Sequence, residues 1–289
     1  MRYDGVLYRP PSEAQSLLLQ VTVGCSYNRC TFCDMYRDKQ FRVKDLEEVR
    51  KDIEEAANYR FRRVFLCDGD ALVAPQPFLV DVLSCMQEKM PFVDRVGTYG
   101  DCRSILKKKP EDLKRLAGLK LGIIYHGIES GDDAVLKAIK KGSTAAQTIE
   151  AGLRVKEAGI LYSAIVLLGI AGRDGGLRHA EETAKVLNAI QPDFIGVLTT
   201  MVCDGTPLAN AAQSRKFVLP SRLGLLEELK VLLENLRIKK GLLTSNHSSN
   251  YLPLRVVFPY QREEAVARLQ KVLENKDETV LKPEYLRGL

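Results

Sequence analysis

Residues 17–33 read LLLQVTVGCSYNRCTFC, and this stretch decides the fold. Its first part, Leu17–Val23, is rich in leucine and valine and ends at Gly24, which predicts a buried strand. Three cysteines follow within nine residues: Cys25, Cys30 and Cys33. Ligands of α/β sheets and barrels gather at the carboxyl ends of the strands. The sequence therefore predicts a ligand site on the loop that carries these thiols.

Five further apolar runs predict strands, and the amphipathic segments between them predict helices. The predicted strands are Arg63–Cys67, Asp94–Tyr99, Leu121–His126, Leu161–Leu168 and Asp193–Thr200. An alternation of strand and helix is typical of βα units around a parallel sheet. We therefore expect an α/β fold with six strands at its core.

The pattern changes toward the C-terminus. A long amphipathic helix is predicted over Arg222–Lys240, with leucines along one side, and a last helix over Glu263–Glu274. Between them, Thr244–Pro253 is polar and rich in turn-forming residues. No segment has the length and composition of a flexible linker. We expect residues 1–205 to form the core and residues 206–289 to form a helical C-terminal extension that packs on it.

Composition narrows the class of protein. The chain has 289 residues, 45% hydrophobic and 28% charged, which is typical of a globular protein and excludes collagens and disordered chains. Its 43 basic and 37 acidic side chains give a net charge of +6, a weak signal for nucleic-acid binding. No apolar run reaches the ~18 residues of a membrane span, and no secretory signal is recognisable. The seven cysteines, an odd number, argue against a disulfide framework. We expect a cytoplasmic protein without a membrane partner.

The cysteine loop favours a particular metal chemistry. Sites rich in thiolates bind zinc or iron–sulfur clusters. A structural zinc site needs a fourth ligand at short spacing. The other four cysteines are isolated, and the three histidines lie at positions 126, 179 and 247. Three thiolates suit a cubane cluster with one iron open to an external ligand. Structural zinc and simple burial of the thiols are the alternatives.

At this point the sequence resembles the radical S-adenosylmethionine (SAM) superfamily. In that family, three cysteines spaced C-x3-C-x2-C, with an aromatic residue before the last, bind a [4Fe–4S] cluster. Phe32 matches the aromatic residue, whereas the first spacing here is x4. The resemblance implies a partial (β/α)6 TIM-like barrel, a cluster on Cys25, Cys30 and Cys33, and SAM on the open iron. It also implies reductive cleavage of SAM to a 5′-deoxyadenosyl radical that abstracts hydrogen from a substrate, in an anaerobic setting.

Other segments at predicted strand ends resemble the branch that contains methylthiotransferases and oxygen-independent coproporphyrinogen oxidases. They are CDGDAL (67–72), GIESG (127–131), LLGI (167–170) and GTPL (205–208). SNHSSNYLP (245–253) and KPEYLRGL (282–289) resemble another radical SAM group. The contacts to cofactor that the resemblance implies are Phe32, Tyr36, Gly69, Asp70, Gly127, Glu129, Ser130, Leu168 and Gly169. Asp68-Gly69-Asp70 is equally typical of an ordinary turn, and Glu129-Ser130 of a helix cap.

Two isolated cysteines near predicted strand ends, Cys102 and Cys203, are candidates for catalysis as hydrogen-atom donor or covalent acceptor. The alternative is that they are inert core residues. Arg103 and the lysine run 107–109 could attract an anionic substrate, although such a run is also typical of a solvated face.

The expected partners are a small-molecule substrate, with an anion as one option, and an electron donor such as flavodoxin or ferredoxin. We expect no nucleic-acid partner, because the chain has no basic accessory segment. Two other functions stay open: an RNA-modifying radical SAM enzyme, and a non-catalytic iron–sulfur scaffold or redox protein of the same fold.

Overall fold

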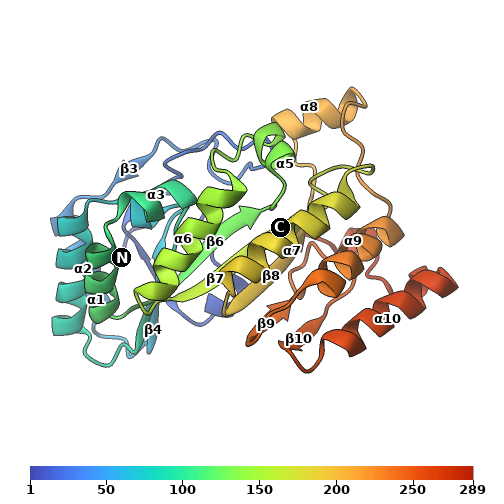
Figure 1. The fold of residues 1–289 in the computed structure, drawn as a ribbon. Helices are drawn as coiled ribbons and strands as arrows, with labels where there is room; N and C mark the ends of the chain where they lie inside the picture. The colour runs from blue at the N-terminus through green and yellow to red at the C-terminus, as the bar shows by residue number, and fades with distance from the viewer. Residues whose placement is uncertain (289) are drawn as a thin grey trace. The chain divides into compact units, whose positions relative to one another are not determined.

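The computed structural model describes residues 1–288, and Leu289, which ends the KPEYLRGL segment, lies outside the described residues (Figure 1). The fold is mixed α/β. Eight strands form one sheet in the linear order β1-β4-β5-β6-β7-β8-β9-β10, and β2 pairs with β3 in a small second sheet. The strands are β1 Leu17–Gln20, β2 Thr22–Val23, β3 Arg42–Val43, β4 Arg63–Cys67, β5 Arg95–Tyr99, β6 Leu121–Glu129, β7 Leu161–Leu168, β8 Phe194–Thr199, β9 Gly241–Thr244 and β10 Arg255–Phe258.

Helices alternate with these strands, as the sequence predicts. They are α1 Leu46–Ala56, α2 Gln76–Lys89, α3 Cys102–Lys107, α4 Pro110–Gly118, α5 Asp133–Ala138, α6 Ala145–Glu157, α7 Gly176–Ile190, α8 Pro207–Gln213, α9 Arg222–Asn235 and α10 Arg262–Asn275. Short 3-10 helices lie at η1 Pro11–Glu13, η2 Ala71–Val73, η3 Glu278–Val280 and η4 Glu284–Leu286. Among residues 1–288, no helix combines the length and apolar character needed to cross a membrane.

The chain folds into two compact units. The first contains Met1–Asn28, Met35–His126 and Glu150–Tyr162. The second contains Arg29–Asp34, Gly127–Ile149 and the chain from Ser163 onward.

In the first unit, β1, β4, β5 and the start of β6 run parallel. Aromatic rings fill the space on one side of these strands. The ring of Phe65 meets the rings of Tyr99 and Tyr125 edge-on, with centroids 5.0 and 5.9 Å apart. Helices α1 and α2 pack against each other (Figure 1). Because the strands are parallel, their carboxyl ends share one edge, where the cysteine loop begins.

In the second unit, β8 lies between β7 and β9 and is parallel to both. Strand β10 completes this edge and is antiparallel to β9. Helix α9 packs against α7 on one side and α10 on the other (Figure 1). Five of the six leucines of α9 are buried, which accounts for the apolar face that the sequence predicts.

The α/β fold class is confirmed, and the bounds of β4 and β7 match the predicted ones. The predicted strand Leu17–Val23 is wrong as one element. After Gln20 the chain leaves the main sheet, and Thr22–Val23 pairs with Arg42–Val43 instead. Strand β6 runs three residues further than predicted, through Glu129. The division of the chain at residue 205 stays a prediction.

The C-terminal extension differs most from expectation. The helix predicted to reach Lys240 ends at Asn235, because Leu236 already has an extended backbone with φ −69° and ψ 135°. The extension is also not purely helical, since it adds β9 and β10 to the sheet. Both strands have four residues and flank the polar turn-rich segment, so their hydrophobic pattern is too short to recognise.

Candidate active site

The first part of the cysteine loop belongs to the first unit. Cys25 is half-buried and follows β2. The hydroxyl of the next residue, Ser26, donates a hydrogen bond of 2.7 Å to Asp70 Oδ2. Asp70 is fully buried, and its Oδ1 accepts from the Ser104 hydroxyl at 2.7 Å and from the Asp101 N–H at 3.3 Å. Both oxygens of Asp70 thus bind the protein, and its carboxylate ties the cysteine loop to the start of α3.

Burial raises the pKa of Asp70 to about 6, and the neighbouring charge of Asp101 adds to the shift. The hydrogen bonds from Ser26 and Ser104 oppose it by stabilising the carboxylate.

The first cysteine spacing is one residue longer than in the family pattern, and the contacts of Tyr27 and Asn28 explain how the longer loop is held. Tyr27 lies under the guanidinium of Arg103, whose Cζ is 3.7 Å from the ring centroid. Asn28 has a left-handed backbone, with φ 45°, and its Nδ2 donates to the Tyr36 carbonyl at 2.6 Å. Asparagine adopts this conformation more readily than other non-glycine residues. The longer loop is therefore held by a stacked ring and a turn rather than left loose.

Gly69 lies where the end of β4 meets the cysteine loop. A Cβ at this position would come 2.7 Å from the Tyr36 ring and 3.0 Å from the Cys25 Cβ, so only glycine fits. Two buried polar atoms of this unit, the Tyr36 hydroxyl and Asp68 Oδ1, have no hydrogen-bond partner among the described residues. Burial and the charge of Asp68 raise the pKa of the Tyr36 hydroxyl, which stays protonated and able to donate.

The other oxygen of Asp68 has several hydrogen-bond partners. Its Oδ2 accepts from the Gly24 N–H at 3.0 Å and from Lys39 Nζ at 3.1 Å. Of the two aspartates after β4, Asp68 thus has one oxygen without a partner among residues 1–288, whereas both oxygens of Asp70 accept hydrogen bonds from the protein. The sequence predicts Asp70 as the cofactor contact, and that assignment stays a prediction.

The second part of the loop, Arg29–Asp34, belongs to the second unit. The Thr31 N–H donates to the Ile139 carbonyl at 2.9 Å, and the Thr31 carbonyl accepts from the Leu208 N–H at 3.0 Å. The side chain of Phe32 packs on a buried apolar cluster made of Ile139, Leu167, Ile170 and Leu208. Cys30 and Cys33, both half-buried, flank this anchored pair of residues.

The candidate catalytic cysteines have different surroundings. Cys203 is half-buried, and its thiol is hydrogen-bonded to Asp34, the residue after Cys33. Burial, followed by the charge and hydrogen bond of Asp34, raises the pKa of Cys203 to about 11, which keeps the thiol protonated at neutral pH. Cys102 is buried in the first unit at the first residue of α3, where Tyr162 is one of its neighbours.

Two of the four basic residues considered for an anionic substrate, Arg103 and Lys108, are engaged in other contacts. Arg103, besides stacking, is paired with Asp101. Lys108 points inward and donates from Nζ to the Ala74 carbonyl at 2.7 Å, so this lysine does not belong to a solvated face.

The end of β6 carries a strained residue. Glu129 has φ 60°, which is uncommon for any residue but glycine, asparagine or aspartate. Its carboxylate forms an ion pair of 2.9 Å with Lys141 and folds back over Gly127. A Cβ on Gly127 would come 2.3 Å from Glu129 Oε1, so glycine makes room for this carboxylate. Strain of this kind concentrates at functional sites.

The remaining predicted contacts lie at the ends of β6 and β7. Ser130 is buried, and its Oγ is 2.7 Å from His179 Nδ1. The Leu168 carbonyl accepts from both the N–H and the hydroxyl of Thr200, each at 2.8 Å. Gly169 has φ 78°, a conformation that glycine adopts without strain.

Sequence reasoning missed Glu228 on α9, whose Oε1 accepts from the Gly169 N–H at 2.9 Å. The sequence does contain a sign that this glutamate is buried. Position 228 lies three residues after Leu225 and four before Leu232, on the leucine face of the helix, and an acid there is an anomaly. Burial raises the pKa of Glu228 to about 8.

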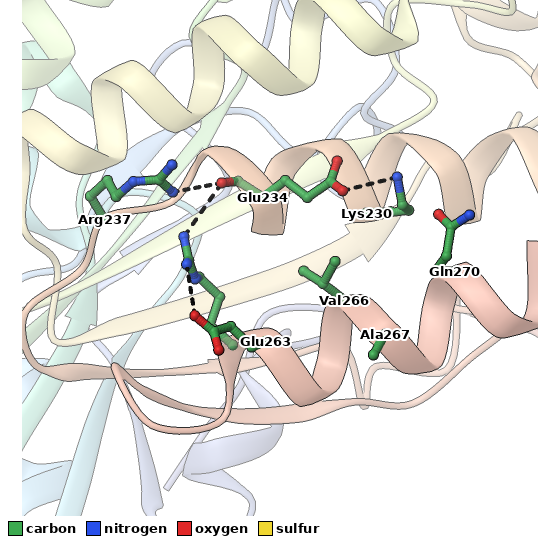
Figure 2. Close-up of a pocket in the computed structure, with 8 residues that line it drawn as sticks. Lys230, Glu234, Arg237, Glu263, Val266, Ala267 and Gln270 are labelled. Carbon is green, nitrogen blue, oxygen red and sulfur yellow. Dashed lines mark hydrogen bonds and ion pairs between the residues drawn. The ribbon is translucent and has the colours of Figure 1, made fainter.

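Two observations concern sites elsewhere in the chain. Among residues 1–288, no three His, Cys, Asp or Glu side chains are already arranged to hold a metal ion, so the cluster ligands stay a prediction. A surface pocket between α9 and α10 has a volume of about 410 Å³ (Figure 2). Its charged side chains already pair, with Lys230 3.0 Å from Glu234 Oε1 and Arg237 donating to the Glu234 carbonyl at 2.6 Å.

The fold is α/β with mostly parallel strands in its main sheet, and the loop that carries the three thiols follows β2. The sequence matches the model of the radical SAM superfamily over residues 19–187, more than half of the chain. The chain therefore belongs to the radical SAM superfamily.

Solved structures of several radical SAM enzymes share the fold. The methyltransferase TsrM from Kitasatospora setae, with cobalamin and a [4Fe–4S] cluster bound, has a TM-score of 0.60 at 15% identity, covering 88% of this chain and 52% of that one. The crystal structure of methylornithine synthase PylB has a TM-score of 0.54 at 16% sequence identity, and the match covers 92% of this chain and 85% of PylB. Coproporphyrinogen III oxidase HemN from Escherichia coli has a TM-score of 0.56 at 16% sequence identity, and the match covers 76% of this chain and 52% of HemN.

At these identities the likeness shows the fold alone, and the chain spans about half the length of TsrM and HemN. Comparison with curated proteins gives no match.

Proposed function

We propose that this protein is a radical SAM enzyme that acts on a small-molecule substrate. The observation that carries the proposal is the family match over residues 19–187, which includes the three-cysteine loop. When bound, a [4Fe–4S] cluster and SAM together supply a 5′-deoxyadenosyl radical that abstracts hydrogen from the substrate. Cys25, Cys30 and Cys33 are the residues that would hold the cluster.

The surroundings of the loop support a cofactor of this size and charge. Gly69 lets the backbone after β4 pack directly on Tyr36 and Cys25, where a Cβ would clash with both. Asp68 Oδ1 and the Tyr36 hydroxyl are buried without a hydrogen-bond partner among the described residues. Because buried polar atoms normally have partners, these two atoms are suited to bind a ligand. A carboxylate oxygen suits the ammonium group of SAM. We propose that Asp68 makes this contact and that Asp70 positions the loop through Ser26.

We propose further contacts to SAM at Phe32 and at the ends of β6 and β7. Phe32 and its apolar neighbours suit an adenine ring, as do the backbone groups at Leu168 and Gly169. Glu129, next to Gly127 and paired with Lys141, suits ribose hydroxyls. We assign Ser130 to support of this segment through its contact with His179.

For the step after hydrogen abstraction we propose that Cys203 gives its thiol hydrogen atom to the substrate radical; the S–H bond breaks, a C–H bond forms, and the thiyl radical left on Cys203 returns to the thiol by taking one electron from the electron donor and one proton. Its thiol is protonated at neutral pH and contacts the residue that follows Cys33. Cys102 is the second candidate, although its burial argues for a core role. We propose further that an electron donor such as flavodoxin or ferredoxin reduces the cluster, and that the reaction takes place in the cytoplasm without oxygen.

The proposal is tested on anaerobically reconstituted protein. We expect about four iron atoms per chain and release of 5′-deoxyadenosine when SAM and dithionite are added. Cys30→Ala should lose iron and cleavage together, whereas Cys85→Ala, which changes a half-buried cysteine of α2, should retain both.

The controls separate the alternatives. An intact cluster with no release of 5′-deoxyadenosine would overturn the enzyme proposal and favour a non-catalytic iron–sulfur protein. Iron retained in Cys30→Ala would overturn the ligand assignment. Cys203→Ser should keep the iron content and the cleavage of SAM, and lose product once a substrate is known.

A further inference from the structure

A buried carboxyl group from the C-terminal extension contacts the backbone at the end of β7. Glu228 lies in α9 and is fully buried. Its Oε1 accepts a hydrogen bond of 2.9 Å from the Gly169 N–H. Two glycines make this approach possible. A Cβ on Gly169 would come 2.8 Å from the Leu225 side chain, and a Cβ on Gly176 would come 2.6 Å from Glu228 Oε2.

The same carboxyl group packs against a histidine that is hydrogen-bonded to the end of β6, although His179 Nε2 itself has no hydrogen-bond partner among residues 1–288. Glu228 Oε1 is 3.4 Å from His179 Nε2, and His179 Nδ1 is 2.7 Å from Ser130 Oγ. Ser130 Oγ also accepts from the Asp132 N–H at 3.0 Å, which leaves its hydroxyl hydrogen to donate to Nδ1. In a neutral ring the hydrogen then lies on Nε2, the nitrogen that faces Glu228.

The charge states agree with this arrangement. Burial lowers the pKa of His179 to about 4, although the Asp132 carboxylate and the Leu167 carbonyl act in the opposite direction. Burial also raises the pKa of Glu228 to about 8. At neutral pH the histidine is therefore neutral and the glutamic acid is mainly protonated, so the 3.4 Å approach of Glu228 to His179 Nε2 is a contact between two neutral polar groups rather than a salt bridge.

The backbone at Gly169 has a particular need for this acceptor. The chain turns sharply there, with φ 78° at Gly169 and a hydrogen bond of 3.0 Å from the Gly172 N–H to the Gly169 carbonyl. The Gly169 N–H points to the α9 side chain and not to a backbone carbonyl. Without Glu228 this buried donor would be unsatisfied, which is costly enough to reorganise the turn.

We propose that Glu228 is a positioning residue for the SAM site, fixing the Gly169 turn directly and the Ser130 segment through His179. The inference rests on the proposed function, because it assumes that SAM binds at the ends of β6 and β7. It assigns part of the C-terminal extension to the architecture of the cofactor site, a role that no sequence motif indicates.

Three variants at one position test the proposal. Glu228→Gln keeps an acceptor oxygen at the same distance, Glu228→Leu removes it, and Glu228→Asp withdraws it by one methylene group. Glu227→Gln, on the exposed side of the same helix, is the matched control. The first measurement is hydrogen–deuterium exchange of the peptide 165–175 without SAM. The second is the dissociation constant for SAM, by calorimetry on anaerobically reconstituted protein.

We expect Glu228→Leu and Glu228→Asp to speed exchange in this peptide and weaken SAM binding about fivefold to tenfold, the effect of one net hydrogen bond. Glu228→Gln should restore both to wild-type values, which a merely structural loss of packing would not do. If Glu228→Leu does not fold, Glu228→Asp decides the question.

Unchanged exchange in Glu228→Asp would overturn the proposal, and so would faster exchange with unchanged affinity for SAM. Failure of the proposed function looks different. In that case the wild-type protein itself binds no SAM, before any variant is compared, and the positioning role falls with it.

Discussion

The buried Glu228 makes the stability of the protein depend on pH in a way that one substitution removes. Its pKa of about 8 in the folded state lies above the ~4.3 of an unfolded glutamic acid. A group whose pKa is raised on folding contributes stability below the unfolded value, and this stability is lost as the pH rises through the folded value. Between these values the loss is about 1.4 kcal/mol per pH unit.

Replacement by glutamine removes this titration. We expect the free energy of unfolding of Glu228→Gln, relative to the wild type, to rise by about 2 kcal/mol from pH 6 to pH 8, because ionisation flattens the curve near pH 8. His179 titrates in the opposite sense, since its pKa is lowered to about 4 and its contribution is lost as the pH falls. That contribution is present in both proteins and largely cancels in the difference.

The measurement is urea unfolding of both reconstituted proteins at pH 6, 7 and 8, followed by circular dichroism without oxygen. Glu227→Gln should follow the wild type at every pH, because that side chain is exposed. A difference between Glu228→Gln and wild type that stays constant from pH 6 to pH 8 would refute the reasoning. It would mean that Glu228 is ionised in the folded protein, as a partner of a charged His179.

Three further substitutions have expected outcomes. Cys30→Ala should reduce the iron content well below that of Cys85→Ala, measured by colorimetric iron assay; equal contents would count against the ligand assignment. Gly69→Ala should cost about 1–3 kcal/mol in urea unfolding, because its Cβ meets a buried tyrosine ring at 2.7 Å, whereas Gly118→Ala, with open space around it, should be neutral or slightly stabilising. Gly131→Ala should cost more than about 3 kcal/mol, since its Cβ would lie 2.3 Å from a backbone oxygen of α7; a fully stable variant would show that α7 can shift.

The sequence was most informative where a continuous apolar run meets a glycine or a polar turn. Strands β4 and β7 follow this rule, and their bounds were predicted residue by residue. The rule fails where a polar side chain inside the run has a distant partner. Gln20 donates to the Asp68 carboxylate at 3.2 Å, and the chain leaves the main sheet directly after it. A partner 48 residues away is not visible in local hydrophobic pattern.

The candidate site shows the same limit at the level of single atoms. The motif Asp68-Gly69-Asp70 was recognised, but the choice between its two carboxylates depends on which oxygen already has a partner. That depends on Ser26 and Ser104, which the fold brings to Asp70 from both sides. Spacing in the sequence locates such a segment at a strand end, and only the structure tells which oxygen is available.

Position 228 offers the strongest argument that α9 does more than cover the core. Leucines surround it on the buried face, and a leucine there would avoid the cost of burying a carboxyl group. Such an acid is retained where its oxygen satisfies a buried donor, and the Gly169 N–H, which has Glu228 as its acceptor among residues 1–288, is that donor. Proteins often accept a loss of stability at one residue where that residue fixes the geometry of a functional site. If Gly169 holds SAM, the apolar pattern of α9 is interrupted at a position whose side chain hydrogen-bonds the end of β7.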